Sequence, residues 1–236
     1  MSTNEPRYID EQRTIAPLRG PLLSPVEYAS LLQSDFDTSY SDHRDVWTHE
    51  AAMRQAPIRL HGELVGARHV LDVGAGRGRD TAYLLEQGHR VTAIDLVAAP
   101  EWATLKQRWG DKVCFHTKGL LELEGTVVFD AVLDNGCLHH QHPSSYPSYL
   151  ARLHALLRPS GLFTISVFHT DEAQGQLYVN QAQRLYREFS EHELIDLLEA
   201  AGFARVDSGL VPRTQTGLRY LVATTRKTLH RGGSAT

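Results

Sequence analysis

Three glycines at alternate positions, Gly74, Gly76 and Gly78, are the most informative feature of the 236-residue chain. They follow an apolar run and precede a helical pattern, so the segment is predicted to leave a strand and enter a helix. Glycine lets a backbone approach a ligand closely because no Cβ stands in the way, and free N–H groups at a helix N-terminus favour an anionic or electron-rich group. Asp95 ends the next apolar run, where a carboxylate can accept hydrogen bonds from both hydroxyls of a ribose. The pattern predicts a nucleotide-like ligand.

A second polar cluster, Asp134-Asn-Gly-Cys-Leu-His139-His140, follows a later apolar run. Histidine titrates near neutral pH and can remove a proton from a nucleophile, so His139 or His140 is a candidate general base. Asp134 can contact the ligand or orient a histidine. In the alternative interpretation, the two histidines only hydrogen-bond backbone at a strand-to-helix junction. His142 and His169 add imidazoles, but no carboxylate or cysteine spacing supports a metal site, and none is expected.

The rest of the chain predicts the elements that must position these residues. Short β-branched runs alternate with helical patterns from about residue 68, which is typical of βαβ units and a parallel sheet. The predicted strands are 69–73, 90–95, 112–116, 129–134 and 161–168, followed by 204–211 and 220–227. The last two have no helix between them and must pair antiparallel. We therefore expect an α/β fold, a Rossmann-like doubly wound seven-stranded sheet with an antiparallel C-terminal hairpin.

The N-terminal part shows no strand pattern and suggests short helices at about 25–33 and 46–64. It is predicted to form a helical cap, or lid, over residues 1–60. Residues 61–228 would form the ligand-binding domain, and 229–236 a flexible tail.

The glycine spacing distinguishes two nucleotide ligands. A dinucleotide fingerprint needs its third glycine at position 79, where this chain has Arg79. The pattern G-x-G-x-G preceded by Asp72 instead resembles motif I of the class I S-adenosylmethionine (SAM) dependent methyltransferases, and the 129–141 segment resembles their motif IV. A weaker similarity points to thiol, thiopurine and tellurite methyltransferases.

This resemblance implies a SAM cofactor and a role for each matching residue. The three glycines would line the methionine portion, Asp72 would hold its amino group, and Asp95 would bind the ribose. The family's adenine-binding acid is replaced by Gly119, so adenine would be read by the backbone of Gly119 and Leu120 or by Glu122. The complete set of expected cofactor contacts is Asp72, Gly74, Ala75, Gly76, Gly78, Asp95, Leu96, Gly119, Leu120, Asp134 and Asn135.

The expected reaction is methyl transfer to a nitrogen, sulfur or oxygen atom of a small molecule, in which alignment of the acceptor can suffice without a base. The acceptor would contact residues from the lid and from the insertion at 169–189, namely Tyr40, Arg44, Trp47, His169 and Tyr178. The aromatic members of this set could equally pack the lid onto the core. Arg213 and Arg219 flank the terminal hairpin turn and could reach an anionic acceptor.

Charge and composition limit the other possibilities. The chain has 24 Lys+Arg against 28 Asp+Glu, and its whole net charge of −4 lies in residues 1–45, so a nucleic-acid substrate is not expected. Two cysteines and the absence of a long apolar run predict a cytoplasmic protein without a membrane segment, as a monomer or homodimer. The alternatives are an NAD(P)-dependent oxidoreductase and a SAM-binding protein that transfers no methyl group.

Overall fold

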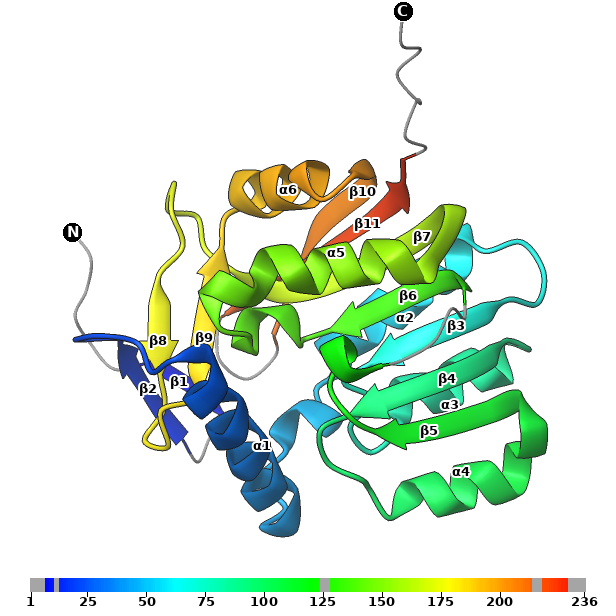
Figure 1. Ribbon diagram of the computed structural model, residues 1–236, viewed down its shortest axis with the longest axis horizontal. Helices are drawn as coiled ribbons and strands as arrows, with labels where there is room; N and C mark the ends of the chain where they lie inside the picture. The colour runs from blue at the N-terminus through cyan, green and yellow to red at the C-terminus, as the bar shows by residue number, and fades with distance from the viewer. Residues whose placement is uncertain (1–6, 11–12, 124–127, 214–217, 229–236) are drawn as a thin grey trace, which may run out of the picture.

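The computed structural model describes residues 7–10, 13–123, 128–213 and 218–228. The predicted flexible tail, 229–236, lies outside these residues. Helices cover both faces of a twisted sheet, and a smaller layer of strands projects from one end of it (Figure 1).

Seven strands form the central sheet in the spatial order β5-β4-β3-β6-β7-β11-β10. Their bounds are β3 (His69–Val73), β4 (Arg90–Asp95), β5 (Val113–Thr117), β6 (Phe129–Asn135), β7 (Leu157–His169), β10 (Phe203–Pro212) and β11 (Arg219–Lys227). The first five are parallel to one another, whereas β11 runs antiparallel to both β7 and β10. The predicted doubly wound sheet with a terminal hairpin is confirmed.

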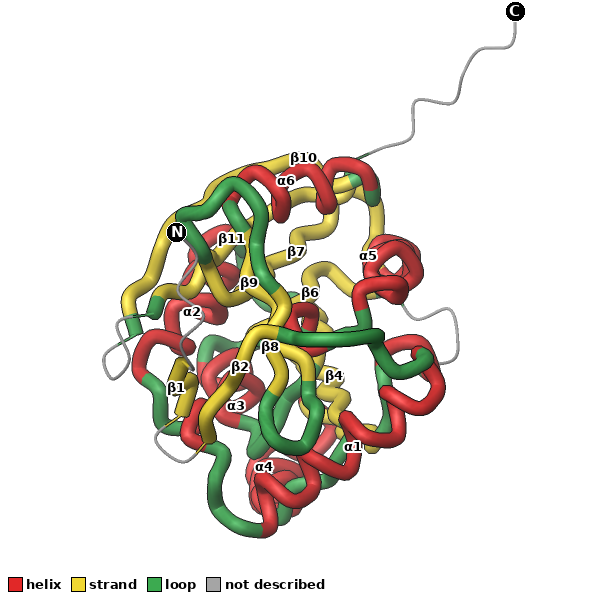
Figure 2. The backbone as a smooth tube through the Cα atoms, turned by 90° about the vertical axis from the view of Figure 1, so that its left-hand side faces the viewer, coloured by secondary structure: helices red, strands yellow, loops and turns green. Residues whose placement is uncertain are grey.

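Four further strands were not predicted. They are β1 (Arg7–Asp10), β2 (Arg13–Pro17), β8 (Leu177–Val179) and β9 (Leu185–Phe189). β9 pairs with the end of β7, and β8, β2 and β1 continue from it (Figure 2). The prediction of an N-terminal part without strands is therefore wrong. The N-terminal strands have five residues or fewer, too short for a clear alternating pattern, and β2 pairs with a segment distant in sequence.

The lid is otherwise helical, as predicted, over α1 (Pro25–Ser41), the short 3-10 turns η1 (Val46–Thr48) and η2 (Ala51–Arg54), and α2 (Gln55–Glu63). α1 begins at a capping box of Ser24 and Glu27 and runs eight residues beyond the predicted end at residue 33. The buried side chains of Leu32 and Asp35 hold this part of the helix against the rest of the protein.

Helices of the core lie on the two faces of the sheet and bury two apolar layers. They are α3 (Arg79–Glu86), α4 (Glu101–Trp109), α5 (Tyr146–Leu156) and α6 (Glu191–Ala200). The alternation along β3 shows the division, because Val70 packs in the layer of α2 and α3 while Leu71 and Val73 pack in the layer of α5 and α6. These layers fix the carboxyl ends of β3, β4 and β6 side by side, where ligands bind in such sheets.

Candidate active site

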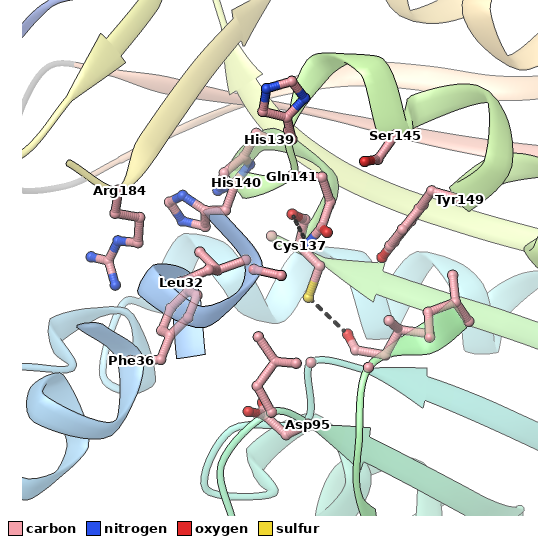
Figure 3. A pocket seen from close by; sticks show the side chains of 18 of the residues that line it. Leu32, Phe36, Asp95, Cys137, His139, His140, Gln141, Ser145, Tyr149 and Arg184 are labelled. Atoms are coloured by element: carbon pink, nitrogen blue, oxygen red, sulfur yellow. Dashed lines mark hydrogen bonds between the residues drawn. The ribbon is translucent and has the colours of Figure 1, made fainter. Parts of the chain in front are cut away.

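A cavity of about 560 Å³ opens at the carboxyl ends of β3, β4 and β6, beneath α1 (Figure 3). This volume falls in the usual range for small-molecule sites. Its walls come from the glycine loop, the ends of β4 and β6, the lid, and β9. Aromatic side chains make up much of the wall, so the cavity suits a ligand with flat, apolar faces.

The glycine loop is tied to β4 by its backbone. Gly74 N and Ala75 N both donate to the carbonyl of Ile94, at 2.8 and 3.0 Å. Gly74 has φ +72°, and a Cβ there would lie 1.9 Å from Cys137 Sγ, so only glycine fits. Gly74 lines the cavity, whereas Ala75 and Gly76 lie beside a smaller adjoining hollow. Gly78 lies in neither wall, and it packs against Leu105.

Asp95 closes the loop at the end of β4. Its Oδ2 accepts from Gly76 N at 2.8 Å and its Oδ1 from Val97 N at 3.0 Å. A carboxylate has about four lone-pair sites, so two remain for a ligand that enters the cavity. Burial raises the pKa of Asp95 to about 6. The cavity wall continues through Leu96, and through Gly119 and Leu120 on the far side.

Two predicted cofactor contacts lie behind the cavity wall. Asp72 accepts a hydrogen bond from Thr81 Oγ1 at 2.5 Å, which ties β3 to α3. Asp134 accepts from the backbone N–H of Cys137 and from the hydroxyl of Tyr149, which fixes the turn after β6. Burial raises the pKa of Asp134 to about 6 and, together with the charge of Asp80, that of Asp72 to about 7. The hydrogen bonds of Asp72 and Asp134 thus hold neighbouring segments of the chain in position.

Asn135 does line the cavity and joins the lid to the core. Its Nδ2 donates to the carbonyl of Met53 at 2.7 Å and to Asp80 Oδ2 at 2.5 Å. Asn135 thus anchors η2 of the lid beside the glycine loop.

His139 and His140 both line the cavity, on η5 (Leu138–His140). His140 Nδ1 lies 2.7 Å from the carbonyl of Leu185, an acceptor only, so Nδ1 carries the proton and Nε2 keeps a lone pair. Burial and the charge of Arg184 lower the pKa of His140 to about 3. Burial, followed by the neighbouring His140, lowers the pKa of His139 well below its usual value. Both rings are neutral at physiological pH.

The lid contributes Tyr40 and Trp47 to the cavity wall, as predicted for substrate contacts. Two arginines of the glycine loop hold this part of the lid. Arg77 donates to both oxygens of Asp45, at 2.6 and 2.9 Å, and to the carbonyl of Tyr40 at 3.0 Å. Arg79 donates to the carbonyl of Trp47 at 2.8 Å. These contacts could not be predicted from the sequence, because they join segments about 30 residues apart.

The other predicted substrate residues lie outside the cavity wall. Arg44 pairs with Asp42 at the end of α1, and His169 Nε2 lies 3.2 Å from Asp171 Oδ1. Tyr178 is buried in β8, which pairs with β2, and its hydroxyl donates to Gln176. His169 and Tyr178 were expected to contact the acceptor as part of the insertion at 169–189, but these two side chains have the other partners described above.

The structure instead adds cavity-lining residues that sequence reasoning missed. They are Phe36, Phe168, Arg184 and Tyr220. Tyr186, which belongs to the 169–189 insertion expected to contact the acceptor, lines the cavity as well. Arg213, flagged as a possible acceptor contact, also lines the cavity and is buried. Two of these residues could have been found from the sequence. Phe168 and Tyr220 lie near strand ends at the edge of the sheet where the cavity opens.

Within the described ranges, no group of three or more His, Cys, Asp or Glu side chains is arranged to hold a metal ion. Over the same residues, no helix has the length and apolar character needed to cross a bilayer.

A family model described as a methyltransferase domain matches residues 46–208. The chain belongs to the methyltransferase domain family. Its match covers the glycine loop, Asp95, both histidines and the tyrosine-rich segment after β7, so the family and the cavity coincide in the chain.

One solved structure is similar to this chain over nearly its whole length. The 1,6-didemethyltoxoflavin-N1-methyltransferase of Burkholderia thailandensis, crystallised with bound 1,6-didemethyltoxoflavin and S-adenosylhomocysteine, is 63% identical. The match has a TM-score of 0.93 and covers 95% of this chain and 100% of that one. The N-methyltransferase NodS of Bradyrhizobium japonicum WM9, with S-adenosylhomocysteine, shares the fold at 15% identity and a TM-score of 0.61, over 85% of this chain and 97% of that one.

Curated relatives match over shorter stretches. The ubiquinone biosynthesis O-methyltransferase of Rickettsia typhi is 31% identical over 115 residues, which are 48% of this chain and 46% of that protein. The chain thus spans about half the length of this curated relative.

The chain is therefore a SAM-dependent small-molecule methyltransferase. The site fits this cofactor: the backbone of Gly74 lines the cavity, and Asp95 keeps acceptor capacity for a diol. The alternative of an NAD(P)-dependent oxidoreductase is set aside by the family match.

Proposed function

We propose that this methyltransferase methylates a ring nitrogen of a flat heterocycle, with 1,6-didemethyltoxoflavin as its acceptor. The observation that carries the proposal is the cavity itself, which joins the Gly74–Asp95 end to an aromatic chamber under the lid. The 63% identical relative, crystallised with that heterocycle, supports the same acceptor.

The cofactor end of the cavity would be occupied by SAM. Gly74 would face its methionine portion, Asp95 would accept hydrogen bonds from its ribose hydroxyls, and Leu96, Gly119 and Leu120 would surround its adenine. SAM supplies an electrophilic methyl group on a positively charged sulfur. Every other task, which is to bind, align and desolvate the acceptor, falls to residues of the chain.

The aromatic chamber would align the acceptor. Phe36 and Trp47 of the lid meet edge to face at 5.8 Å, and Phe168 of the core stacks against His139 at 3.9 Å. A planar ring between the lid and the core would be shielded from water, which strengthens its polar contacts and keeps the nucleophilic nitrogen unsolvated. These side chains favour a flat acceptor over a flexible thiol or amine.

The two histidines would act as neutral hydrogen-bond acceptors. With a proton on Nδ1 bound to Leu185, His140 can offer Nε2 to an N–H of the acceptor. Methylation of an N–H tautomer releases one proton, which an imidazole with a pKa of about 3 can relay but not retain. We therefore assign His140 to acceptor alignment. The pKa of His139 is lowered as well, so a general base at His139 or His140 stays a prediction from the sequence.

The test is a direct assay of the purified chain with SAM and 1,6-didemethyltoxoflavin. We expect a product heavier by one methyl group, with NMR placing that group on N1, and an equal amount of S-adenosylhomocysteine. A panel of thiols, phenols and aliphatic amines serves as the comparison. Methylation of a member of that panel, with the heterocycle left unchanged, would contradict the proposal.

The remaining sequence-based predictions accompany this proposal. The closed cavity supports a small acceptor rather than nucleic acid, because a polymer would have to pass beneath α1. Cytoplasmic location and a monomeric or homodimeric state stay predictions from the sequence.

A further inference from the structure

Three aromatic rings of the cavity form a continuous row. Tyr186 and Phe168 are stacked with centroids 6.1 Å apart and planes at 28°, and Phe168 and Tyr220 with centroids 5.5 Å apart and planes at 22°. All three line the cavity. We call these residues the ring row.

An arginine stands at each end of the ring row. The Arg184 guanidinium lies 5.1 Å from the Tyr186 ring centre, and the Arg213 guanidinium lies 5.4 Å from that of Tyr220. Both arginines line the cavity, and their side chains are 1% and 2% exposed. Figure 3 shows Arg184 on the same side of the cavity as His140. The ring row therefore has one buried, positively charged arginine at each end.

Each arginine keeps donors without an acceptor among the described residues. Arg184 gives Nε and Nη2 to the hydroxyl of Tyr186, while its Nη1 is buried without a partner. Arg213 has no hydrogen-bond partner for Nη1, and its Nε, 3.6 Å from Glu50 Oε2, forms an ion pair without a hydrogen bond. Buried polar groups of folded proteins are nearly always hydrogen-bonded, because an unsatisfied buried donor is costly. Donors left open at two places in one cavity wall point to a ligand with two acceptors.

The charges around the arginines select the kind of acceptor atom. Arg184 Nε lies 3.2 Å from Asp35 Oδ2, and Arg213 Nε lies 3.6 Å from Glu50 Oε2. Both carboxylates come from the lid, and each balances its arginine's positive charge. The open N–H groups therefore belong to nearly neutral pairs, which suit carbonyl oxygens better than a phosphate or a carboxylate.

We propose that Arg184 and Arg213 each donate a hydrogen bond to a separate carbonyl oxygen of the acceptor, so that the enzyme selects heterocyclic diones. This inference rests on the proposed function and deepens it. His139 stacks on Phe168, the middle ring of the row, with centroids 3.9 Å apart, so it lies between the arginines at the two ends. If the acceptor molecule carries an N–H between two carbonyl groups, the N–H would face the neutral His139 ring while the two oxygens face Arg184 and Arg213.

Binding of three probes to the protein loaded with S-adenosylhomocysteine tests the proposal. Quinazoline-2,4-dione carries both oxygens, quinazolin-4-one carries one, and quinazoline carries none. We expect each oxygen to improve affinity about tenfold or more, since hydrogen bonds from charged groups are strong. If quinazoline binds the unmodified protein as tightly as the dione, the proposal is overturned without any variant.

Variants assign the oxygens. Arg184→Lys and Arg213→Lys keep the charge beside Asp35 and Glu50 and remove the planar fork of donors. Each should lose the preference for one oxygen, with affinity for S-adenosylhomocysteine retained as proof of folding. Arg205→Lys, on the exposed part of β10, is the matched control and should keep all three affinities. Unchanged preferences in both cavity variants would overturn the proposal.

The outcomes separate this inference from the proposed function. If 1,6-didemethyltoxoflavin is not methylated, the proposed acceptor is wrong, and the probe ratios still report whether the arginines read oxygens. If it is methylated while both arginine variants bind the probes in the ratios of the unmodified protein, only the inference fails.

Discussion

Asp95 shows how one residue can serve two purposes. Its carboxylate holds the glycine loop through Gly76 N and the following turn through Val97 N, and it still faces the cavity. The sequence predicted its ligand role from position alone. The sequence could not predict its altered titration, because burial in the folded protein raises its pKa to about 6.

Cofactor affinity should therefore depend on pH through Asp95. The ionised carboxylate accepts the ribose hydrogen bonds, so affinity for S-adenosylhomocysteine should fall as pH drops through about 6 and level off above about pH 7. Asp95→Asn should weaken binding by about 1.5 to 3 kcal/mol at pH 7.5 and remove this pH dependence. Calorimetric titrations between pH 5.5 and 8 measure both effects. A variant that keeps the pH dependence would assign it to another group.

At the scale of elements, the lid and the glycine loop behave as one unit. Arg77 links Asp45 of the lid to a loop whose own backbone follows β3, and Glu101 of α4 completes the cluster at 3.0 Å. Sequence reasoning predicted a lid from the charge and helix pattern of residues 1–60. It missed the hydrogen bonds of Arg77 with Asp45 and Tyr40, which we call the clamp. A basic residue inside a glycine loop does not indicate its partner in the fold.

Loss of this clamp should loosen the lid. Arg77→Ala leaves Asp45 buried without its partner, so we expect the free energy of unfolding to fall by about 2 to 4 kcal/mol. Hydrogen exchange over residues 40–48 should accelerate, and the Michaelis constant for the acceptor should rise. Arg108→Ala, which removes an exposed pair with Glu86, is the control and should change stability by no more than about 0.5 kcal/mol. If the two variants lower the free energy of unfolding equally, Arg77 does not stabilise the lid.

On the scale of the whole molecule, the central sheet and its binding edge could be predicted, and the extension of the sheet could not. Strands 69–73 and 90–95 were predicted with the bounds they have in the structure, since burial on both faces leaves continuous apolar runs. On the acceptor side, Tyr40 and Trp47 of the lid were predicted, but the wall formed with β9 was not, because β2, β8 and β9 are short and depend on one another. Arg184, Tyr186 and Phe168 meet only after those strands have paired.

The N-terminal strand should therefore matter to the acceptor and not to the cofactor. Ile15 of β2 is 1% exposed and packs in the same core layer as Phe168 and Tyr186. Ile15→Ala should cost about 2 to 4 kcal/mol of stability and weaken acceptor binding, with affinity for S-adenosylhomocysteine retained. Chemical denaturation and the two ligand titrations measure this. Val65→Ala, at a 79% exposed position away from the cavity wall, is the matched control. Parallel loss of both ligands would mean that β2 supports the whole fold rather than the acceptor wall.

The contacts of Arg77 and Arg79 with the lid also bear on how the two ligands affect each other. Both arginines follow Gly74, which lines the cofactor end of the cavity, so a loop held by SAM would also hold the lid in place. Coupling between two sites is reciprocal, so an acceptor bound under the lid would strengthen cofactor binding by the same factor. We therefore expect S-adenosylhomocysteine to bind more tightly when the acceptor is present, and the acceptor to bind more tightly when S-adenosylhomocysteine is present.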